Sequence, residues 1–330
     1  MTLNLEDILF YSSIPFLVIA LIGNLLVIRI VHKIREMHTP TNYLLVSVAV
    51  SDVITILLWS LYFFPFERFI CKVVVIIEIS ITISSITFTV LAVERYHAVL
   101  KPFRAGLRLN EDNIKKAVGS IWIAGVVTCF PEFFLKEWSE PYEDCIGPWS
   151  LHMNQASKVY TIISTSFTCA QLALMIYCYT CLIRGLFFSS TVYPVTDRET
   201  TAEKKKLVIT FLLATTGFFV GYWPTEFLHS FVAAGDAKQI DSKLYSDLVG
   251  VSDFIFVCSL CFNPIIYSFR SKKFKEGLKS IFVCSAPETA ISNVHWIEIM
   301  AGERSDARAD QQSLRRIAET ELLPKFLSIH

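Results

Sequence analysis

The chain has 330 residues, of which 53% are hydrophobic and only 18% are charged, and its mean hydropathy is +0.49. Soluble domains carry about 25% charged residues, so this composition excludes an ordinary soluble protein and indicates a membrane protein. Nucleic-acid-binding proteins carry an excess of basic residues, whereas the formal net charge of this chain is zero. We therefore expect no nucleic-acid partner.

Seven apolar stretches follow one another along the chain, separated by short polar linkers. Each is long enough to cross a hydrocarbon core of about 30 Å as a helix. Continuous apolar runs also favour helices over the alternating strands of a membrane barrel. We therefore predict an all-α membrane protein, a seven-transmembrane helix bundle over residues 8–269 that follows a short outer segment of residues 1–7. The stretches cover residues 8–31, 43–64, 70–100, 114–135, 159–188, 207–234 and 244–269.

Lysine and arginine are concentrated after the first, third, fifth and seventh stretches. The positive-inside rule places these segments in the cytoplasm, so we expect an extracellular amino terminus and a cytoplasmic carboxy terminus. The head of the chain, MTLNLEDIL, contains acids and no basic region, and so lacks the form of a cleavable signal. These features predict a multi-pass protein of the plasma membrane.

The third stretch has a cysteine at one end and a charge pair at the other, and we expect the rest of the bundle to pack around it. Cys71 lies at its outer end, and Cys145 is the other cysteine on the outer face. Because the cell exterior is oxidising, the two favour a disulfide between the third stretch and the second outer loop.

Residues 270–284 predict a short amphipathic helix, with an apolar face opposite a basic one, lying on the inner leaflet. Cys284 ends this segment and is a candidate for palmitoylation, the alternative being an unmodified thiol. Residues 285–330 are polar and charged, which is typical of a disordered cytoplasmic tail. Phosphorylation of its hydroxyls would add charge that a partner such as arrestin recognises.

Short motifs in the apolar stretches resemble, in identity and order, the signature positions of rhodopsin-like (class A) G-protein-coupled receptors. The resemblance covers about residues 8–284 and favours a peptide-receptor-like member. It implies a receptor that binds an extracellular ligand and activates a heterotrimeric G protein. The motifs are Gly23-Asn24, the SVAVSD ending at Asp52, Glu94-Arg95-Tyr96, Trp122, Tyr179, the FFVGYWP ending at Pro224, and Asn263-Pro264-Ile265-Ile266-Tyr267.

The resemblance implies that Glu94 restrains Arg95 at rest and that activation frees Arg95 to contact the G protein. Tyr179 and Tyr267 would then repack around it. An alternative is that Arg95 only marks the membrane interface, as snorkelling arginines do. The usual second acid near the start of the sixth stretch is absent from the run beginning at Glu203, so a second restraint is not expected.

Two prolines, Pro224 and Pro264, predict kinks in the sixth and seventh stretches, since proline removes a helical hydrogen bond. A kinked sixth stretch would let its inner half swing as a lever. The sequence departs from the family at Tyr222, where tryptophan is usual, and at Gln171, where the fifth stretch usually has proline. The aromatic residue that acts as a switch in the sixth stretch of the family is therefore altered here. The helical bulge that usually accompanies the proline of the fifth stretch is not expected.

Asp52 lies in the middle of the second stretch, where an ionised carboxylate needs partners. The resemblance places a sodium ion at the matching carboxylate, and Asn24, Ser84, Ser259 and Asn263 lie at depths from which they would offer oxygen ligands. A protonated or water-bridged aspartate is the alternative. We expect no other cofactor.

A ligand cavity is expected between the outer halves of the third, fifth, sixth and seventh stretches, near Ile77, Glu78, Glu226, His229 and Asp253. Intramembrane acids almost always face the protein interior, so this lining predicts a cationic ligand. The outer loops add further acids, including Glu132 and Glu137.

Alternatives remain at this cavity. Its acids would instead form structural bridges if they paired with Lys72 or Lys158. Amine receptors carry aspartate where Ile77 stands, so a basic peptide is favoured over a small amine, which stays an alternative. Val257 replaces the lysine of a retinal protein. A transporter is an alternative from a different class, but the sequence contains no internal repeat of the kind that transporters usually have. The sequence also contains no HExxH or GxSxG motif, so we do not expect an enzyme.

Overall fold

A computed structural model gives the fold and describes residues 5–63, 67–100, 109–141, 144–188, 198–235, 241–270 and 272–282. Within these ranges, seven helical spans are long and apolar enough to cross a membrane, which confirms the predicted fold class. The spans are Ile8–Lys33, Pro40–Trp59, Phe69–Leu100, Ile114–Leu135, Gln155–Phe187, Lys205–Ala234 and Ser242–Ser268.

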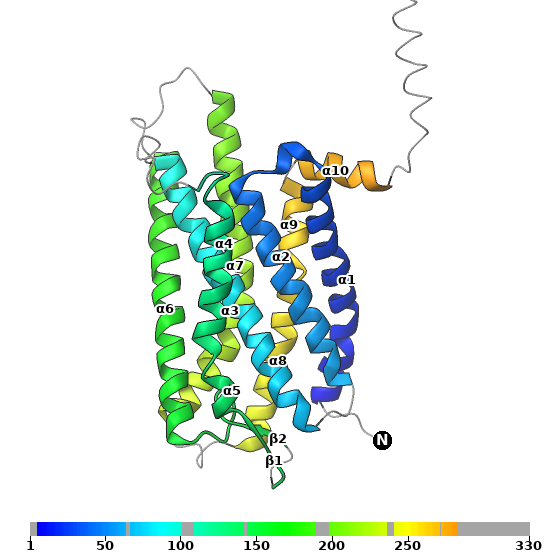
Figure 1. Cartoon of the computed structure of the whole chain (residues 1–330), viewed down its shortest axis with the longest axis vertical. Helices are drawn as coiled ribbons and strands as arrows, with labels where there is room; N and C mark the ends of the chain where they lie inside the picture. Colours follow the sequence, from blue (N-terminus) through cyan, green and yellow to red (C-terminus); the bar gives the residue numbers. More distant parts are fainter. Residues whose placement is uncertain are drawn as a thin grey trace, which may run out of the picture. The chain divides into compact units, whose positions relative to one another are not determined.

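The fourth and the seventh span each consist of two consecutive α-helices, the fifth consists of an α-helix followed by a short π-helix, and the others are single helices. Figure 1 shows the long helices running side by side as one bundle. In chain order the elements are α1 (Leu5–Lys33), η1 (Arg35–Met37), α2 (Pro40–Trp59), η2 (Ser60–Phe63), α3 (Glu67–Leu100), α4 (Ile114–Cys129), α5 (Glu132–Leu135), β1 (Glu137–Ser139), β2 (Asp144–Ile146), α6 (Gln155–Ile183), η4 (Arg184–Phe188), α7 (Arg198–Ala234), α8 (Ser242–Ser259), α9 (Phe262–Arg270) and α10 (Lys272–Phe282).

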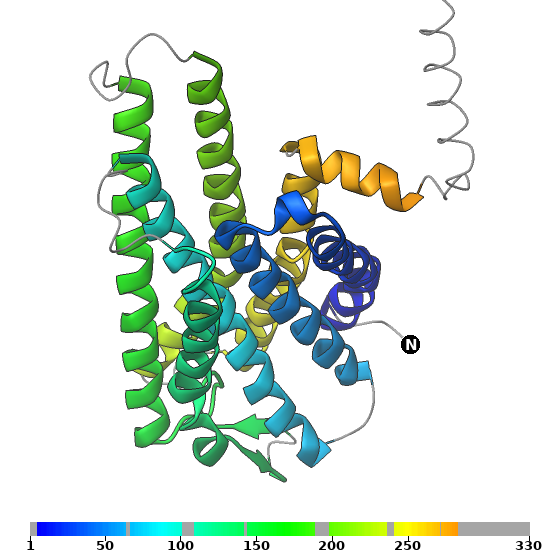
Figure 2. The same ribbon diagram turned by 45° about the horizontal axis from the view of Figure 1, so that its top comes forward.

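Helix α3 is the central helix of the bundle and packs against α2, α4, α6 and α7. Its residues Phe88 and Leu91 are fully buried, in keeping with the predicted organising role of this stretch. Figure 2 shows α2 between α1 and α3, and both neighbours contact it. Apolar side chains exposed on the outer helices, such as Ile123 on α4 and Phe227 on α7, face the surface that lipid would cover in a membrane.

Side-chain caps fix where several helices begin. Thr39 precedes Pro40 at the start of α2, and its hydroxyl accepts a hydrogen bond from the backbone N–H of Asn42 at 3.4 Å. Asn154 caps α6 by accepting from the N–H of Ser157 at 2.8 Å. Because the first amides of a helix have no partner within it, such caps stabilise helix ends by about 1 kcal/mol each.

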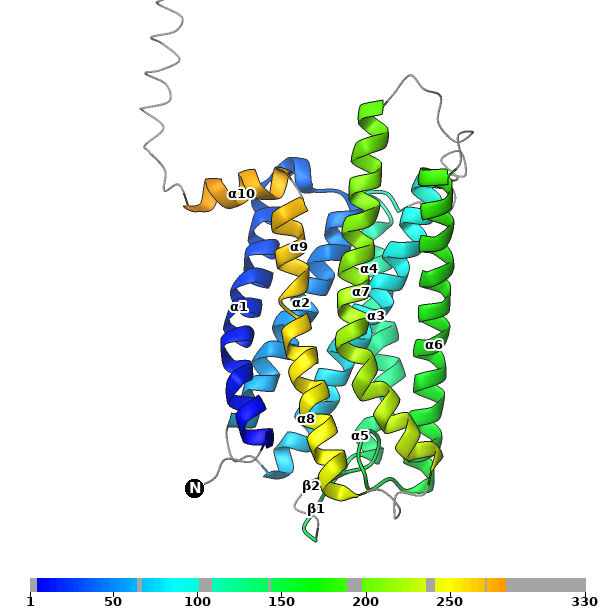
Figure 3. The same ribbon diagram turned by 180° about the vertical axis from the view of Figure 1, so that it is seen from behind.

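The two predicted proline positions behave differently. Pro224 lies inside α7, which continues through it as one helix and changes direction along its course (Figure 3). The seventh span is interrupted between α8 and α9, just before Pro264. Because Pro264 has no N–H, the carbonyl of Leu260 loses its helical donor. The side-chain amide of Asn24 on α1 lies 3.4 Å from that carbonyl and donates to it.

The segment between α5 and α6, predicted above to be the second outer loop and called by that name below, is tied to the bundle at several points. Strands β1 and β2 pair antiparallel, with Trp138 opposite Cys145, and Cys145 forms a disulfide with Cys71 at a Cα separation of 5.5 Å. This bond confirms the predicted pairing. The ammonium of Lys72 donates to the carbonyls of Phe133 at 2.6 Å and Lys136 at 2.8 Å. In Figure 1 this hairpin lies at the same end of the bundle as the start of α1.

The predicted short helix after the seventh span is present as α10. Phe274 is buried, whereas Lys275 is exposed. A Cβ atom at Gly277 would come within 2.7 Å of Ile30 and 2.6 Å of Ile34, so only glycine allows α10 to pack this closely on the end of α1. Cys284 and the predicted tail lie outside the described residues.

Candidate functional site

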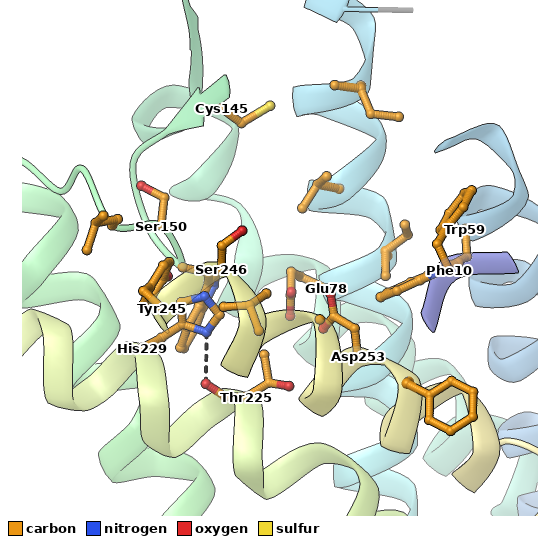
Figure 4. A pocket seen from close by; sticks show the side chains of 18 of the residues that line it. Phe10, Trp59, Glu78, Cys145, Ser150, Thr225, His229, Tyr245, Ser246 and Asp253 are labelled. Carbon is orange, nitrogen blue, oxygen red and sulfur yellow. Dashed lines mark hydrogen bonds between the residues drawn. The ribbon is translucent and has the colours of Figure 1, made fainter. Parts of the chain in front are cut away.

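A cavity of about 510 Å³ occupies the hairpin end of the bundle and is lined by residues of α1, α2, α3, α7, α8 and the second outer loop. Of the residues predicted to line it, Ile77, Glu78, His229 and Asp253 do so. Figure 4 shows the carboxyl groups of Glu78 and Asp253 close together, and the two groups interact electrostatically. The structure therefore brings two predicted acids to one place in the cavity.

Glu226 is not among the residues that line this cavity. It is buried within α7, with only 2% of its surface exposed, and it interacts electrostatically with Glu78. Its carboxylate accepts hydrogen bonds from the hydroxyl of Tyr222 in the same helix and from the hydroxyl of Thr165 in α6. Glu226 thus lies behind the cavity wall and connects two helices.

Two further charged residues, Glu132 and Lys136, are buried at this end of the bundle, although sequence alone assigned Glu132 to an outer loop. Glu132 is 1% exposed, and one of its carboxylate oxygens accepts from Trp149 Nε1 at 3.0 Å and from the hydroxyl of Tyr160 at 2.9 Å. Lys136 is 3% exposed, lines the cavity, and interacts electrostatically with Glu132 and Glu78. Their i, i+4 spacing, which brings side chains together on one helical face, is the signal that would have indicated the pair.

Aromatic rings form another part of the cavity wall. The ring of His229 lies with its centroid 6.0 Å from those of Trp149 and Tyr245, in both cases edge to face. His229 Nδ1 donates to the carbonyl of Thr225 at 2.8 Å, which fixes the orientation of its ring (Figure 4). The cavity thus presents carboxylates and aromatic rings, a combination that suits cations with apolar attachments.

The buried carboxylate of Asp52 is held by two of the four residues predicted to surround it. Ser84 donates to one oxygen at 3.3 Å and Asn263 Nδ2 donates to the other at 3.3 Å. The Ser259 hydroxyl donates instead to the carbonyl of Phe256 at 2.7 Å, and the amide of Asn24 is turned toward Leu260. The side-chain oxygens of Asn24 and Asn263 are buried and accept no hydrogen bond from the described residues.

At the opposite end of α3, Arg95 forms an ion pair with Glu94 at 2.5 Å. Its guanidinium also donates to the hydroxyl of Thr41 on α2 and lies 5.6 Å from the centre of the Phe211 ring on α7. Glu94 is only 5% exposed. This environment suits a paired charge, and it connects three helices through one side chain.

Other motif residues surround this end of α3. The hydroxyls of Tyr179 on α6 and Thr215 on α7 are 3.0 Å apart. The ring of Tyr96 packs 6.0 Å from that of Tyr177. Tyr267 is buried, and its hydroxyl has no hydrogen-bond partner among the described residues.

Two departures from the resemblance are also visible in the structure. α6 is a regular α-helix through Gln171, whose side-chain oxygen accepts a hydrogen bond from Ser85 on α3. Tyr222 stacks on Phe218 at a centroid distance of 5.9 Å. Both substituted side chains are therefore buried within the bundle and hydrogen-bonded there.

Comparison with known proteins assigns these features to a family. The family described as "7 transmembrane receptor (rhodopsin family)" matches residues 23–267. The chain is 26% identical to the mouse (Mus musculus) pyroglutamylated RF-amide peptide receptor, over 82% of this chain and 69% of that protein. It is 26% identical to the human (Homo sapiens) growth hormone secretagogue receptor type 1, over 81% of this chain and 78% of that protein. It is 27% identical to the human neuromedin-K receptor, over 80% of this chain and 59% of that protein.

The family match extends from the first span to the tyrosine of the seventh, and so includes every motif on which the resemblance depended. Members of this family are multi-pass proteins of the plasma membrane and are not enzymes, as the sequence predicted. The chain belongs to the rhodopsin-like, class A family of G-protein-coupled receptors.

Proposed function

We propose that the chain is a receptor for an extracellular basic peptide and that the bound peptide activates a heterotrimeric G protein. The observation that carries this proposal is the excess of acids at the cavity. Glu78 and Asp253 line it, whereas Lys136, its neighbouring cation, also interacts with Glu132. A carboxylate that is removed from water without a partner is costly, so a cationic group of the ligand would stabilise this arrangement.

The two lysines of the structural alternative, Lys72 and Lys158, bond to backbone carbonyls instead of to these acids. Lys72 donates to two backbone carbonyls, and Lys158 donates to the carbonyl of Gly235 at 3.3 Å. Ile77 is 2% exposed and presents an apolar surface where amine receptors have aspartate. The mouse relative is named as a peptide receptor, which supports a peptide over a small amine.

The proposed orientation places the amino terminus and the hairpin outside the cell. The disulfide between Cys71 and Cys145 supports this, because disulfides persist in an oxidising compartment. The cavity then opens outward, and Arg95 lies at the cytoplasmic end of α3. Ligand binding would move α7, break the ion pair of Arg95 with Glu94, and free the guanidinium for the G protein.

We further propose that Asp52 holds a sodium ion. The unpaired oxygens of Asn24 and Asn263 are buried and, together with the Asp52 carboxylate, form the type of oxygen donor set that hard cations prefer. A bound sodium ion would neutralise the aspartate while the receptor is at rest.

The test is a signalling screen in cells that express the chain with a promiscuous G protein, comparing basic peptides, their neutral analogues and monoamines. We expect a basic peptide to signal, and Glu78→Gln to weaken its potency by roughly 30-fold or more, as loss of a buried charge partner does. Glu137→Gln is the matched control, because Glu137 is exposed on β1. A ligand without a basic group whose potency is unaffected by Glu78→Gln would refute the acidic site.

A further inference from the structure

A chain of hydrogen bonds crosses the proline kink of α7. Tyr222 and Glu226 lie one turn apart on either side of Pro224, and the tyrosine hydroxyl donates to Glu226 Oε1. Both side chains are buried, with 9% and 2% of their surfaces exposed. The pair exists because tyrosine replaces the tryptophan usual in the family, since an indole in that position carries no hydroxyl.

The same carboxylate also ties α7 to α6. The hydroxyl of Thr165 in α6 donates to Glu226 Oε2 at 3.0 Å and lies 2.6 Å from the hydroxyl of Ser230 in α7. Ser230 in turn donates to the backbone carbonyl of Glu226 at 2.7 Å. Both oxygens of Glu226 are therefore used, one along α7 and one across to α6.

These hydrogen bonds lie at Pro224, where the angle between the two halves of α7 is least constrained by the backbone. Pro224 removes the backbone hydrogen bond that would otherwise hold the two halves of α7 at a fixed angle. The side-chain hydrogen bond from Tyr222 to Glu226 instead connects the segments on either side of Pro224. The hydrogen bond from Thr165 connects Glu226 to the neighbouring helix, α6. Buried, charge-assisted hydrogen bonds are stronger than exposed ones, so this small group can bias the angle of the kink.

We propose that the Tyr222–Glu226–Thr165 hydrogen bonds form a lock that holds α7 in the resting arrangement, the one in which Arg95 is paired with Glu94. The three are positioning residues. Glu226 interacts electrostatically with Glu78, so a ligand cation at Glu78 would draw the Glu226 carboxylate away from Tyr222 and release the lock. This release step rests on the proposed function, whereas the lock itself does not.

The experiment measures ligand-free signalling per receptor at the cell surface. Tyr222→Phe and Thr165→Val each remove one hydroxyl while conserving volume, and we expect each to raise ligand-free signalling by about tenfold, the effect of losing one charge-assisted hydrogen bond. Thr165→Ser restores the hydroxyl and should return signalling to the wild-type level. Ser166→Ala is the matched control, because Ser166 is exposed and its hydroxyl donates only within α6, to Ile162 at 2.7 Å.

The double variant separates a lock from two unrelated defects. If the residues act as one unit, Tyr222→Phe combined with Thr165→Val should raise signalling less than the product of the single effects. Unchanged or reduced ligand-free signalling in both single variants, at normal surface level, would overturn the lock. Because no ligand is present, this result does not depend on whether the ligand is a basic peptide.

Discussion

The indole N–H of Trp149 donates a hydrogen bond to the buried carboxylate of Glu132 at 3.0 Å and thereby fastens the second outer loop to the inside of the bundle. Trp149 has a φ angle of 60°, in the left-handed region that residues other than glycine rarely adopt. Its ring also contacts Tyr160 and His229. These contacts hold in place the part of the cavity wall that the loop provides.

We predict that Trp149→Phe weakens ligand binding by about tenfold, because the hydrogen bond to a charged, buried partner is lost while the aromatic surface remains. The measurement is ligand dissociation from membranes, where a less firmly held loop should give a faster rate.

Trp138→Phe is the matched control for that change. Its indole N–H is buried but has no partner among the described residues, so its removal costs no hydrogen bond. Equal effects of the two substitutions would show that the hydrogen bond to Glu132 does not hold the loop.

A second prediction concerns the disulfide. Cys71→Ser and Cys145→Ser should each lower the stability of the folded receptor by about 2–5 kcal/mol, and the double variant should lower it no further, because either change removes the same bond. Thermal unfolding of the purified receptor in detergent measures this.

Cys169→Ser serves as the control for the disulfide, since Cys169 is a free, exposed cysteine of α6. Additive losses in the double variant, or an equal loss from Cys169→Ser, would contradict this account of the disulfide.

The sequence was sufficient for the seven spans and the disulfide, because apolar length and the side of the membrane determine both. It did not predict that Glu132 and Lys136 are buried. Acids and lysines near the end of a span are normally solvated, and tertiary contacts bury these two: Trp149 and Tyr160 donate hydrogen bonds to Glu132, and Lys136 interacts electrostatically with Glu132 and Glu78.

The surroundings of Asp52 were predictable only in part. Asn24 lies near the predicted depth, yet its amide serves the carbonyl of Leu260 that Pro264 leaves without a donor. Depth along a helix follows from counting residues, whereas the direction of a side chain depends on which backbone groups its neighbours leave unpaired.

The third prediction tests the sodium site. In wild-type membranes, replacing an organic cation by sodium should lower the affinity of an activating ligand, because an ion bound at rest opposes the active arrangement. Asp52→Asn should remove this sensitivity. Competition binding in the two salts, at equal ionic strength, measures it.

If sodium lowered the ligand affinity equally in wild type and Asp52→Asn, the ion would bind elsewhere. If sodium did not change the ligand affinity of the wild type, the proposed sodium site would be refuted. Ser60→Ala is a suitable control, because Ser60 lies at the end of α2 and its hydroxyl donates within that helix, to Leu57 at 2.6 Å.

The most direct test of the proposed signalling mechanism compares purified wild-type receptor with the Arg95→Ala variant. Guanine-nucleotide exchange on a heterotrimeric G protein and ligand binding are measured on the same samples. Arg29→Ala, at an exposed arginine of α1, is the control. We predict ligand-stimulated exchange in the wild type and the control, and none in Arg95→Ala although the ligand still binds. Undiminished exchange in Arg95→Ala would contradict the proposal that release of Arg95 from Glu94 carries the signal to the G protein.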